Sequence, residues 1–201
     1  MTILWDVDTQ FDFMLPDGKL YVPGAEETVP AMEGLVDAAR AAGIVHVASA
    51  DDHELTDSEI SDEPDFLTTY PPHCLRATRG ARKIPETEQE DPVPLTLEPV
   101  PDRYLEGREF LLLKKNFDVF TNPNTERLLD RLGPEEIVVF GVATDVCDDA
   151  AIRGFLDRGL KVRFVEDAAR GLDEERVAIS TTSWRRRGVE FTTASEVIGT
   201  F

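Results

Sequence analysis

The chain has 201 residues, of which 41% are hydrophobic and 30% charged, as is usual for a soluble globular domain with a substantial core. Its formal net charge of −19 argues against partners such as nucleic acid or an anionic membrane and leaves a small-molecule partner. The two cysteines make no disulfide framework and the first residues carry no export signal, so we expect a cytoplasmic protein in which thiol chemistry is available.

The chain begins with a predicted buried strand, residues 2–7, whose end is rich in carboxylates. Asp6, Asp8 and Asp12 fall within seven residues. Open α/β sheets build their sites at the carboxyl ends of strands, although solvated aspartates in a turn would give the same pattern. Apolar residues on one face and a following glycine then predict a helix over residues 29–42.

Two of the three histidines lie in a long polar loop after a second predicted strand, residues 44–49, in which His46 is expected to pack in the core. Asp51 and His53 are two positions apart, so an extended backbone aims both side chains to one side. His73 follows two prolines, which stiffen its backbone. This set suits a divalent metal such as zinc, iron or manganese, and a solvated acidic loop is the alternative.

A proline- and glutamate-rich stretch, residues 83–108, is expected to be a surface excursion with short extended pieces over residues 93–97, and not a linker, because no second core follows it. The next predicted strand, residues 109–113, runs into Lys114 and Lys115. A lysine at the end of a buried strand needs a charged partner. Otherwise it reaches back to the surface, as we expect at least one of the two to do.

Strands and helices alternate through the second half of the chain. Periodicity and glycine stops predict strands over residues 136–142, 161–165 and 189–193, and helices over residues 124–132, 144–158 and 173–187. Such alternation is typical of a parallel sheet covered on both faces. We therefore expect one Rossmann-like, three-layer α/β domain over residues 1–201, with six mostly parallel strands.

Cys147 lies where a predicted strand passes through a short turn into an alanine-rich helix. The helix dipole and free N–H groups at such a position favour the thiolate, whereas a buried core cysteine is the common alternative. Asp8 and Lys114 follow other strands of the same sheet, and parallel strands end at one shared edge. There, a lysine cation stabilises a thiolate and a carboxylate can exchange its proton.

Four separated motifs cover nearly the whole chain. They are Val-Asp-x-Gln-x-Asp-Phe at residues 7–13, Asp-x-His at residues 51–53, Pro-Pro-His-Cys at residues 71–74 with Thr-x-Gly-Ala at residues 78–81, and Gly-Val-Ala-Thr-Asp-x-Cys at residues 141–147. With them the sequence resembles the isochorismatase-like cysteine hydrolases, and within these the nicotinamidase/pyrazinamidase group. Each motif is weak alone, but four in this order are not expected by chance.

The resemblance implies that Cys147 is the nucleophile and Asp8 the general base. It also implies Lys114 as the third catalytic residue, because its spacing to Phe117 and Phe120 matches the family pattern Lys-x-x-aromatic-x-x-Phe.

The turn before the nucleophile is implied to contain a cis peptide bond between Val142 and Ala143. The N–H groups of Ala143 and Cys147 would then form an oxyanion hole. Substrate-binding residues implied on the ring side of the pocket are Phe13, Tyr70 and Val142, with Tyr70 at a position that is often tryptophan in the family.

For the metal, the resemblance implies Asp51, His53 and His73 as ligands of one divalent ion. Nicotinamidases of the family usually have a third histidine in the following loop, and here the corresponding spacing gives Glu59. A carboxylate at that position favours a harder ion such as Mn²⁺ or Fe²⁺ alongside Zn²⁺. Alternatively, the three protein ligands are completed by water.

Together these expectations describe a metal-dependent cysteine amidohydrolase that converts nicotinamide to nicotinate and ammonia through a thioester. The alternative in the same superfamily is a hydrolase of another small amide or of an N-carbamoyl or ureido compound. A metal-binding or interaction protein without catalysis is the hypothesis from another class, against which the set of Asp8, Lys114 and Cys147 weighs. A homo-oligomer is compatible with the resemblance, since family members are often oligomeric.

Overall fold

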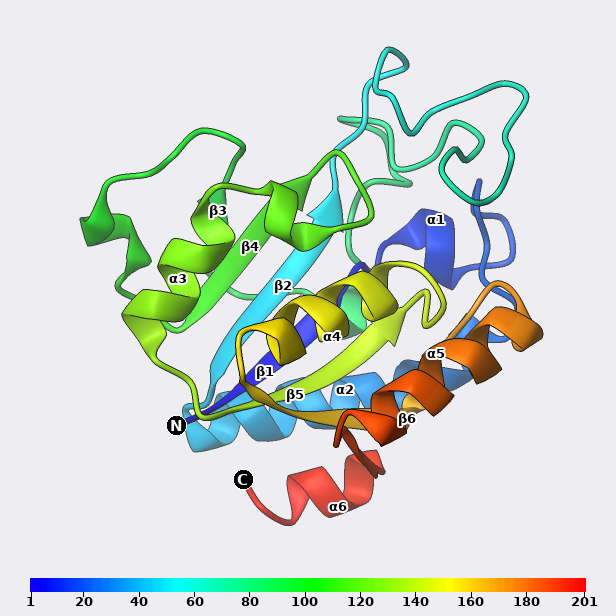
Figure 1. Ribbon diagram of the computed structural model, residues 1–201. Coiled ribbons are helices and arrows are strands. Elements are labelled where there is room, and N and C mark those ends of the chain that lie inside the picture. Colours follow the sequence, from blue (N-terminus) through cyan, green and yellow to red (C-terminus); the bar gives the residue numbers. More distant parts are fainter.

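The computed structural model describes residues 1–201 as a seven-stranded sheet between two layers of helices (Figure 1). In chain order the strands are β1 (Thr2–Val7), β2 (Val45–Asp51), β3 (Val93–Leu95), β4 (Glu109–Lys114), β5 (Glu136–Val142), β6 (Lys161–Arg170) and β7 (Glu190–Thr192). Their order across the sheet is β3-β4-β2-β1-β5-β6-β7, and every neighbouring pair is parallel. All strands therefore present their carboxyl ends along one edge.

The predicted parallel α/β fold is confirmed, but the sheet has seven strands and not six. The additional strand is β3, which pairs with β4 at the edge of the sheet and lies within the stretch that was expected to be a surface excursion. Three residues are too few to show a two-residue periodicity. The central Pro94 is tolerated because an edge strand has no partner on its outer side.

Helices cover both faces of the sheet. On one face lie α1 (Phe11–Met14), α2 (Val29–Ala42) and α6 (Ala194–Ile198), and on the other α3 (Asn124–Leu132), α4 (Cys147–Asp157) and α5 (Glu174–Arg186). Single 3₁₀ turns lie at Ala25–Thr28, Pro85–Thr87, Asp102–Leu105 and Val119–Thr121. No helix is long and apolar enough to cross a membrane.

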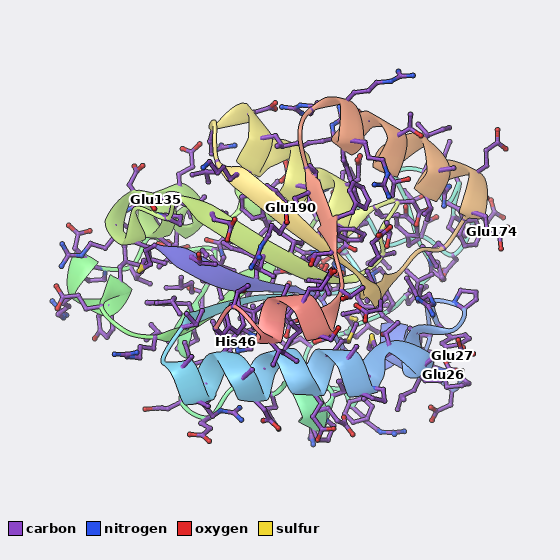
Figure 2. The ribbon with its side chains drawn as sticks, turned by 90° about the horizontal axis from the view of Figure 1, so that it is seen from below. Glu26, Glu27, His46, Glu135, Glu174 and Glu190 are labelled. Atoms are coloured by element: carbon purple, nitrogen blue, oxygen red, sulfur yellow. The ribbon has the colours of Figure 1, made fainter.

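Figure 2 shows the layers from below, with labelled glutamates such as Glu135 and Glu174 at the periphery. His46, which was expected to pack in the core, is buried, and its Nε2 lies 3.5 Å from Oδ2 of Asp6. It therefore belongs to the packing of β2 and not to a ligand site.

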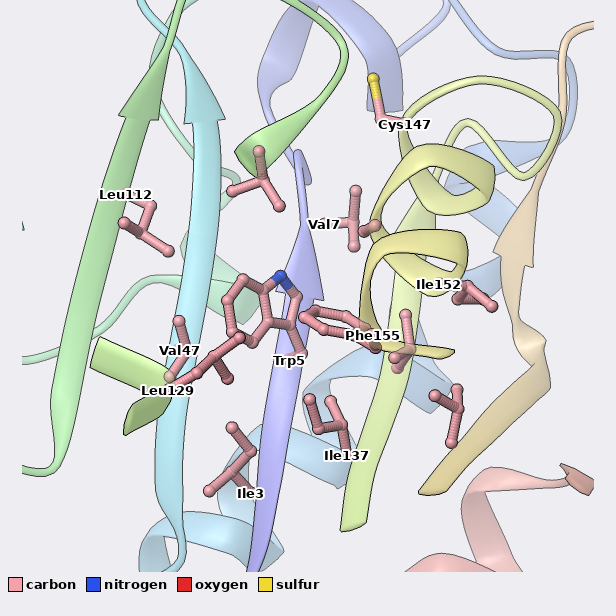
Figure 3. Close-up of a cluster of buried hydrophobic side chains, with 14 of the residues drawn as sticks. Ile3, Trp5, Val7, Val47, Leu112, Leu129, Ile137, Cys147, Ile152 and Phe155 are labelled. Atoms are coloured by element: carbon pink, nitrogen blue, oxygen red, sulfur yellow. The ribbon is translucent and has the colours of Figure 1, made fainter. Parts of the chain in front are cut away.

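An apolar core on the α4 face fixes the start of this helix. Trp5 of β1 meets Phe155 of α4 edge-on, with ring centroids 4.7 Å apart (Figure 3). Fully burying a side chain such as Phe155 stabilises the fold by about 1.5–3 kcal/mol. Cys147 lies at the upper end of the same cluster in Figure 3. Packing thus holds the amino end of α4 at the carboxyl edge of the sheet.

Candidate active site

Asp8, Lys114 and Cys147 meet at the carboxyl edge of the sheet, although more than 100 residues separate Asp8 from Lys114 in the sequence. Nζ of Lys114 lies 2.8 Å from Oδ2 of Asp8 and 3.7 Å from Sγ of Cys147. It also lies 2.5 Å from Oδ1 of Asp51. All four side chains are buried. Lys114 is therefore the lysine that finds charged partners inside the protein, whereas Lys115 is partly exposed.

Asp8 leaves β1 in an uncommon backbone conformation, with φ of 51°. The hydroxyl of Ser49 donates to Oδ1 of Asp8 at 2.7 Å, which leaves Oδ2 to Lys114. Burial raises the pKa of the Asp8 carboxyl; the nearby Lys114 opposes this effect and Asp51 adds to it. A carboxyl with a raised pKa is better matched to exchanging a proton with a thiol.

Burial also raises the pKa of the Cys147 thiol well above its ordinary value, and the charge of Lys114 lowers it less than burial raises it. Burial thus favours the thiol, whereas Lys114 acts as expected from the sequence and favours the thiolate. The sequence indicated the lysine and the helix end, but not how deeply the sulfur is buried. A carboxylate oxygen of Asp8 lies within 4.8 Å of the sulfur, in position to take up its proton.

The turn before Cys147 offers two free donors. The peptide bond between Val142 and Ala143 is cis, as predicted. The N–H groups of Ala143 and Cys147 donate to no other group of the chain. Gly141 is required just upstream, since its φ is 137° and an added Cβ would clash with the carbonyl oxygen of Val7. Two unpaired N–H groups beside a nucleophile are suited to stabilising an oxyanion.

A second buried cluster lies beside the first. It consists of Asp51, His53, Glu59 and His73, whose candidate ligand atoms all lie within 4.8 Å of one another. Oδ2 of Asp51 is 3.7 Å from Nε2 of His53 and 3.5 Å from Nε2 of His73. Oε1 of Glu59 is 3.8 and 4.0 Å from the same two nitrogens. The structure thus brings all four sequence-predicted metal ligands together.

The donor set of this cluster fits a divalent cation. Oδ2 of Asp51 and Nε2 of His53 are buried and have no hydrogen-bond partner in the chain, which is unfavourable unless another group binds them. Burial raises the pKa of Glu59, and the negative charge of Asp51 raises it further. A cation would relieve this repulsion. Two imidazoles and two carboxylates are acceptable ligands for zinc, iron and manganese.

Asp51 joins the two clusters. Its Oδ1 accepts a hydrogen bond from Lys114, and its Oδ2 faces the two histidines. Gln10 fixes the backbone of Asp51: Nε2 of Gln10 donates to the Asp51 carbonyl at 2.8 Å, and Oε1 accepts from the Asp51 N–H at 2.7 Å. Although burial opposes ionisation, Lys114 holds the pKa of Asp51 well below its ordinary value. Asp51 is thus an ionised candidate ligand that is held in a fixed place.

Aromatic rings flank the candidate metal cluster. The ring centroids of Phe13 and Tyr70 lie 5.3 and 6.3 Å from that of His73. Val142 is fully buried in the same apolar cluster as Phe13. A cleft of about 490 Å³ is lined in part by Tyr70 and by Val146, the residue before Cys147, but by none of the residues of the two clusters themselves.

Some supporting residues were not singled out from the sequence. Gln10 and Asp12 belong to the first motif, and Oδ2 of Asp12 accepts a hydrogen bond from the N–H of Cys74 at 2.7 Å, next to His73. For these two the motif itself was a signal. Ser49 carried none, because it is one small residue in an apolar strand.

A buried thiol beside a base, a lysine and free N–H donors at the edge of a parallel sheet defines a cysteine hydrolase. The chain belongs to the isochorismatase family, whose domain model matches residues 2–196. It is similar to the nicotinamidase/pyrazinamidase of Mycobacterium tuberculosis, with 27% identity over 198 residues that cover 97% of this chain and 100% of the relative. For the nicotinamidase of Escherichia coli the identity is 28% over 184 residues, covering 83% and 82%.

Among solved structures, the pyrazinamidase of Pyrococcus horikoshii in complex with zinc superposes with a TM-score of 0.74 at 22% identity, over 96% of this chain and 98% of that one. This likeness shows the shared fold. Family and relatives together show that the protein is a hydrolase resembling the nicotinamidases.

Proposed function

We propose that this protein is a metal-dependent nicotinamidase, an amide hydrolase that converts nicotinamide and water to nicotinate and ammonia. The observation that carries the proposal is the position of Asp51, with one oxygen on Lys114 and the other among the candidate metal ligands. A small substrate can therefore engage both clusters at once. The rings of Phe13 and Tyr70 near His73 suit a flat heterocycle, and the names of the two relatives support this substrate.

Asp51, His53, Glu59 and His73 would hold one divalent ion, which supplies a Lewis acid for the pyridine nitrogen and so helps to orient the ring. The ion is zinc, iron or manganese, and the carboxylates of Asp51 and Glu59 favour the harder Mn²⁺ and Fe²⁺ alongside Zn²⁺.

In the first half of the proposed reaction, Asp8 accepts the proton of the Cys147 thiol, and the thiolate adds to the amide carbon. The carbonyl oxygen becomes an oxyanion that accepts hydrogen bonds from the N–H groups of Ala143 and Cys147. The ammonium of Lys114 stabilises the negative charge that passes between Asp8 and the sulfur. Asp8 then donates its proton to the nitrogen, the C–N bond breaks, and ammonia leaves a thioester on Cys147.

In the second half, the ionised Asp8 accepts a proton from water while the water oxygen adds to the thioester carbon. The same two N–H groups stabilise the second oxyanion. Breaking of the C–S bond releases nicotinic acid, which ionises to nicotinate, and Asp8 returns its proton to Cys147. One carboxyl thus moves the protons in both halves of the cycle.

The wider proposal is one catalytic domain over residues 1–201 that acts on a small molecule in the cytoplasm, with neither nucleic acid nor membrane as a partner. Assembly as a homo-oligomer is compatible with this proposal.

Ammonia release from nicotinamide, measured before and after complete metal removal by a chelator, tests this function. We expect turnover to stop on removal and to return with Zn²⁺, Mn²⁺ or Fe²⁺, and Cys147→Ala to abolish turnover while still binding metal. Turnover that persists without metal, or that occurs only with an N-carbamoyl compound, would favour the alternative hydrolase. A protein that binds metal but turns over none of these compounds would be a binding protein on this fold.

A further inference from the structure

Asp51 is the last residue of β2, whereas the other three candidate metal ligands lie in the loop that follows it. Backbone hydrogen bonds join His53 to Cys74 and Glu59 to Tyr70. Between His53 and Glu59 the chain makes a turn, in which the N–H of Asp57 donates to the carbonyl of Glu54 at 3.0 Å. Ligands on a loop bind a cation well only if other contacts hold the loop in place.

The segment that follows β4 supplies such contacts. Nζ of Lys115 lies 2.9 Å from Oε2 of Glu54 and 2.9 Å from each carboxylate oxygen of Asp57. Two residues further on, the N–H of Phe117 donates to Oε2 of Glu59 at 2.8 Å. This bond engages one oxygen of Glu59 and leaves Oε1 facing the histidines. The loop is therefore held to this segment at both of its ends.

Asp57 extends this contact to His53. Its Oδ2 lies 3.4 Å from Nδ1 of His53 and also accepts the N–H of Glu54 at 2.8 Å. Nε2 of His53 then faces Asp51 and Glu59. A carboxylate on the far nitrogen of a ligating histidine fixes the tautomer and the direction of the ring. Without Lys115, the carboxylates of Glu54 and Asp57 would repel each other in this turn.

We infer that Lys115 and Asp57 are positioning residues that hold His53 and Glu59 in the geometry for binding a divalent cation. This inference rests on the metal site of the proposed function. Lys115 touches none of the four ligands and acts through Asp57. Two adjacent residues therefore serve the two clusters: Lys114 reaches Asp8 and Cys147, and Lys115 secures the loop of the metal ligands.

Titration of the metal-free protein with Mn²⁺, and with Co²⁺ as a spectroscopic probe, tests the inference without any measurement of turnover. Lys115→Met and Asp57→Ala should each weaken Mn²⁺ binding by about 10- to 100-fold and alter the visible spectrum of bound Co²⁺. Lys115→Arg keeps the charge and the donors, so it should restore most of the affinity. Glu54→Gln is the matched control, since Glu54 pairs with Lys115 but touches no ligand. It should stay within about twofold of the wild type.

Thermal melting of the metal-free variants checks that they fold. If Lys115→Met does not fold, Asp57→Asn replaces it in the test, because it preserves the side-chain shape. Asp57→Asn should also weaken Mn²⁺ binding. Wild-type affinity in both Lys115→Met and Asp57→Ala would overturn the inference and leave the metal site standing, as would an equal loss in Glu54→Gln. A wild-type protein that binds neither cation would instead overturn the metal site and with it the proposed function.

Discussion

Replacing Lys114 by methionine removes the cation between two buried carboxylates. In the folded protein Nζ lies 2.8 Å from Asp8 and 2.5 Å from Asp51, and the lysine side chain is 1% exposed. Methionine keeps much of the volume but leaves both carboxylates without their partner. Removing one member of a buried ion pair costs about 3–5 kcal/mol. The free energy of unfolding should therefore fall by about this amount at neutral pH.

The size of this loss should depend on pH. Burial opposes ionisation of Asp51, but Lys114 holds its pKa well below the ordinary value. A carboxyl with a depressed folded-state pKa stabilises the protein fully above its unfolded pKa of about 4, and this stability is lost as the pH falls through the folded pKa. Lys114→Met removes that stabilisation. The difference between wild type and variant is therefore largest near neutral pH and shrinks below about pH 4.

Urea unfolding of both proteins at several pH values, with a chelator present and tryptophan fluorescence as the signal, measures the difference. Lys115→Met is the matched control, because it makes the same change one residue further on. The Lys115 side chain is 23% exposed, compared with 1% for Lys114, so water screens its ion pairs more and their loss should cost less than the loss of Lys114. The reasoning is refuted if Lys114→Met loses no more stability than this control.

Three further predictions concern single residues. As the pH falls, kcat/KM should decline with an apparent pKa above 3.8, the ordinary value for aspartate, because burial raises the pKa of Asp8 and only its ionised form can accept the Cys147 proton. Asp8→Asn should lose nearly all turnover. An apparent pKa at or below 3.8 would contradict this reasoning. Arg176→Ala removes a guanidinium that lies 2.9 Å from the buried Asp145 side chain, so the free energy of urea unfolding should fall by about 1.5–3 kcal/mol. An unchanged urea midpoint would contradict this expectation. Burial raises the pKa of Asp148, whose two oxygens have no partner, so this carboxyl destabilises the fold more near neutral pH, where the unfolded carboxyl is ionised, than near pH 4. Asp148→Val should therefore stabilise the protein by about 1–3 kcal/mol near neutral pH and by less near pH 4, and an equal gain at both would contradict this account.

The regular elements of the fold could be predicted where a long apolar pattern marks them. The predicted helices over residues 29–42 and 124–132 and the predicted strand over residues 136–142 have the same bounds as α2, α3 and β5. β6 extends to Arg170, five residues beyond its prediction, because its pairing with β5 resumes after a shift in register. Its exposed Glu166 and Asp167 interrupt the apolar pattern, so the sequence contained no signal for this continuation.

The candidate site could be predicted where a motif fixes the spacing of its residues. The spacing to Phe117 favoured Lys114 over Lys115, and Lys114 is the one that reaches the buried carboxylates. Glu59 rested on loop spacing alone, and the N–H of Phe117 that holds it is 58 residues away. Contacts between distant loops leave no local pattern in the sequence. The burial that raises the pKa of Cys147 likewise results from the packing of elements that are distant in the sequence.

Asp51 offers one oxygen to Lys114 and the other to the histidines, so the charges at Cys147 and at the proposed metal ligands influence one another directly. Coupling between two binding sites is reciprocal. A bound cation changes the affinity of the pocket at Cys147 for an inhibitor by some factor. The bound inhibitor then changes the affinity of the metal site for the cation by the same factor. If the site holds a cation, its affinity for that cation, measured by equilibrium competition with a chelator, would therefore report pocket occupancy without any turnover.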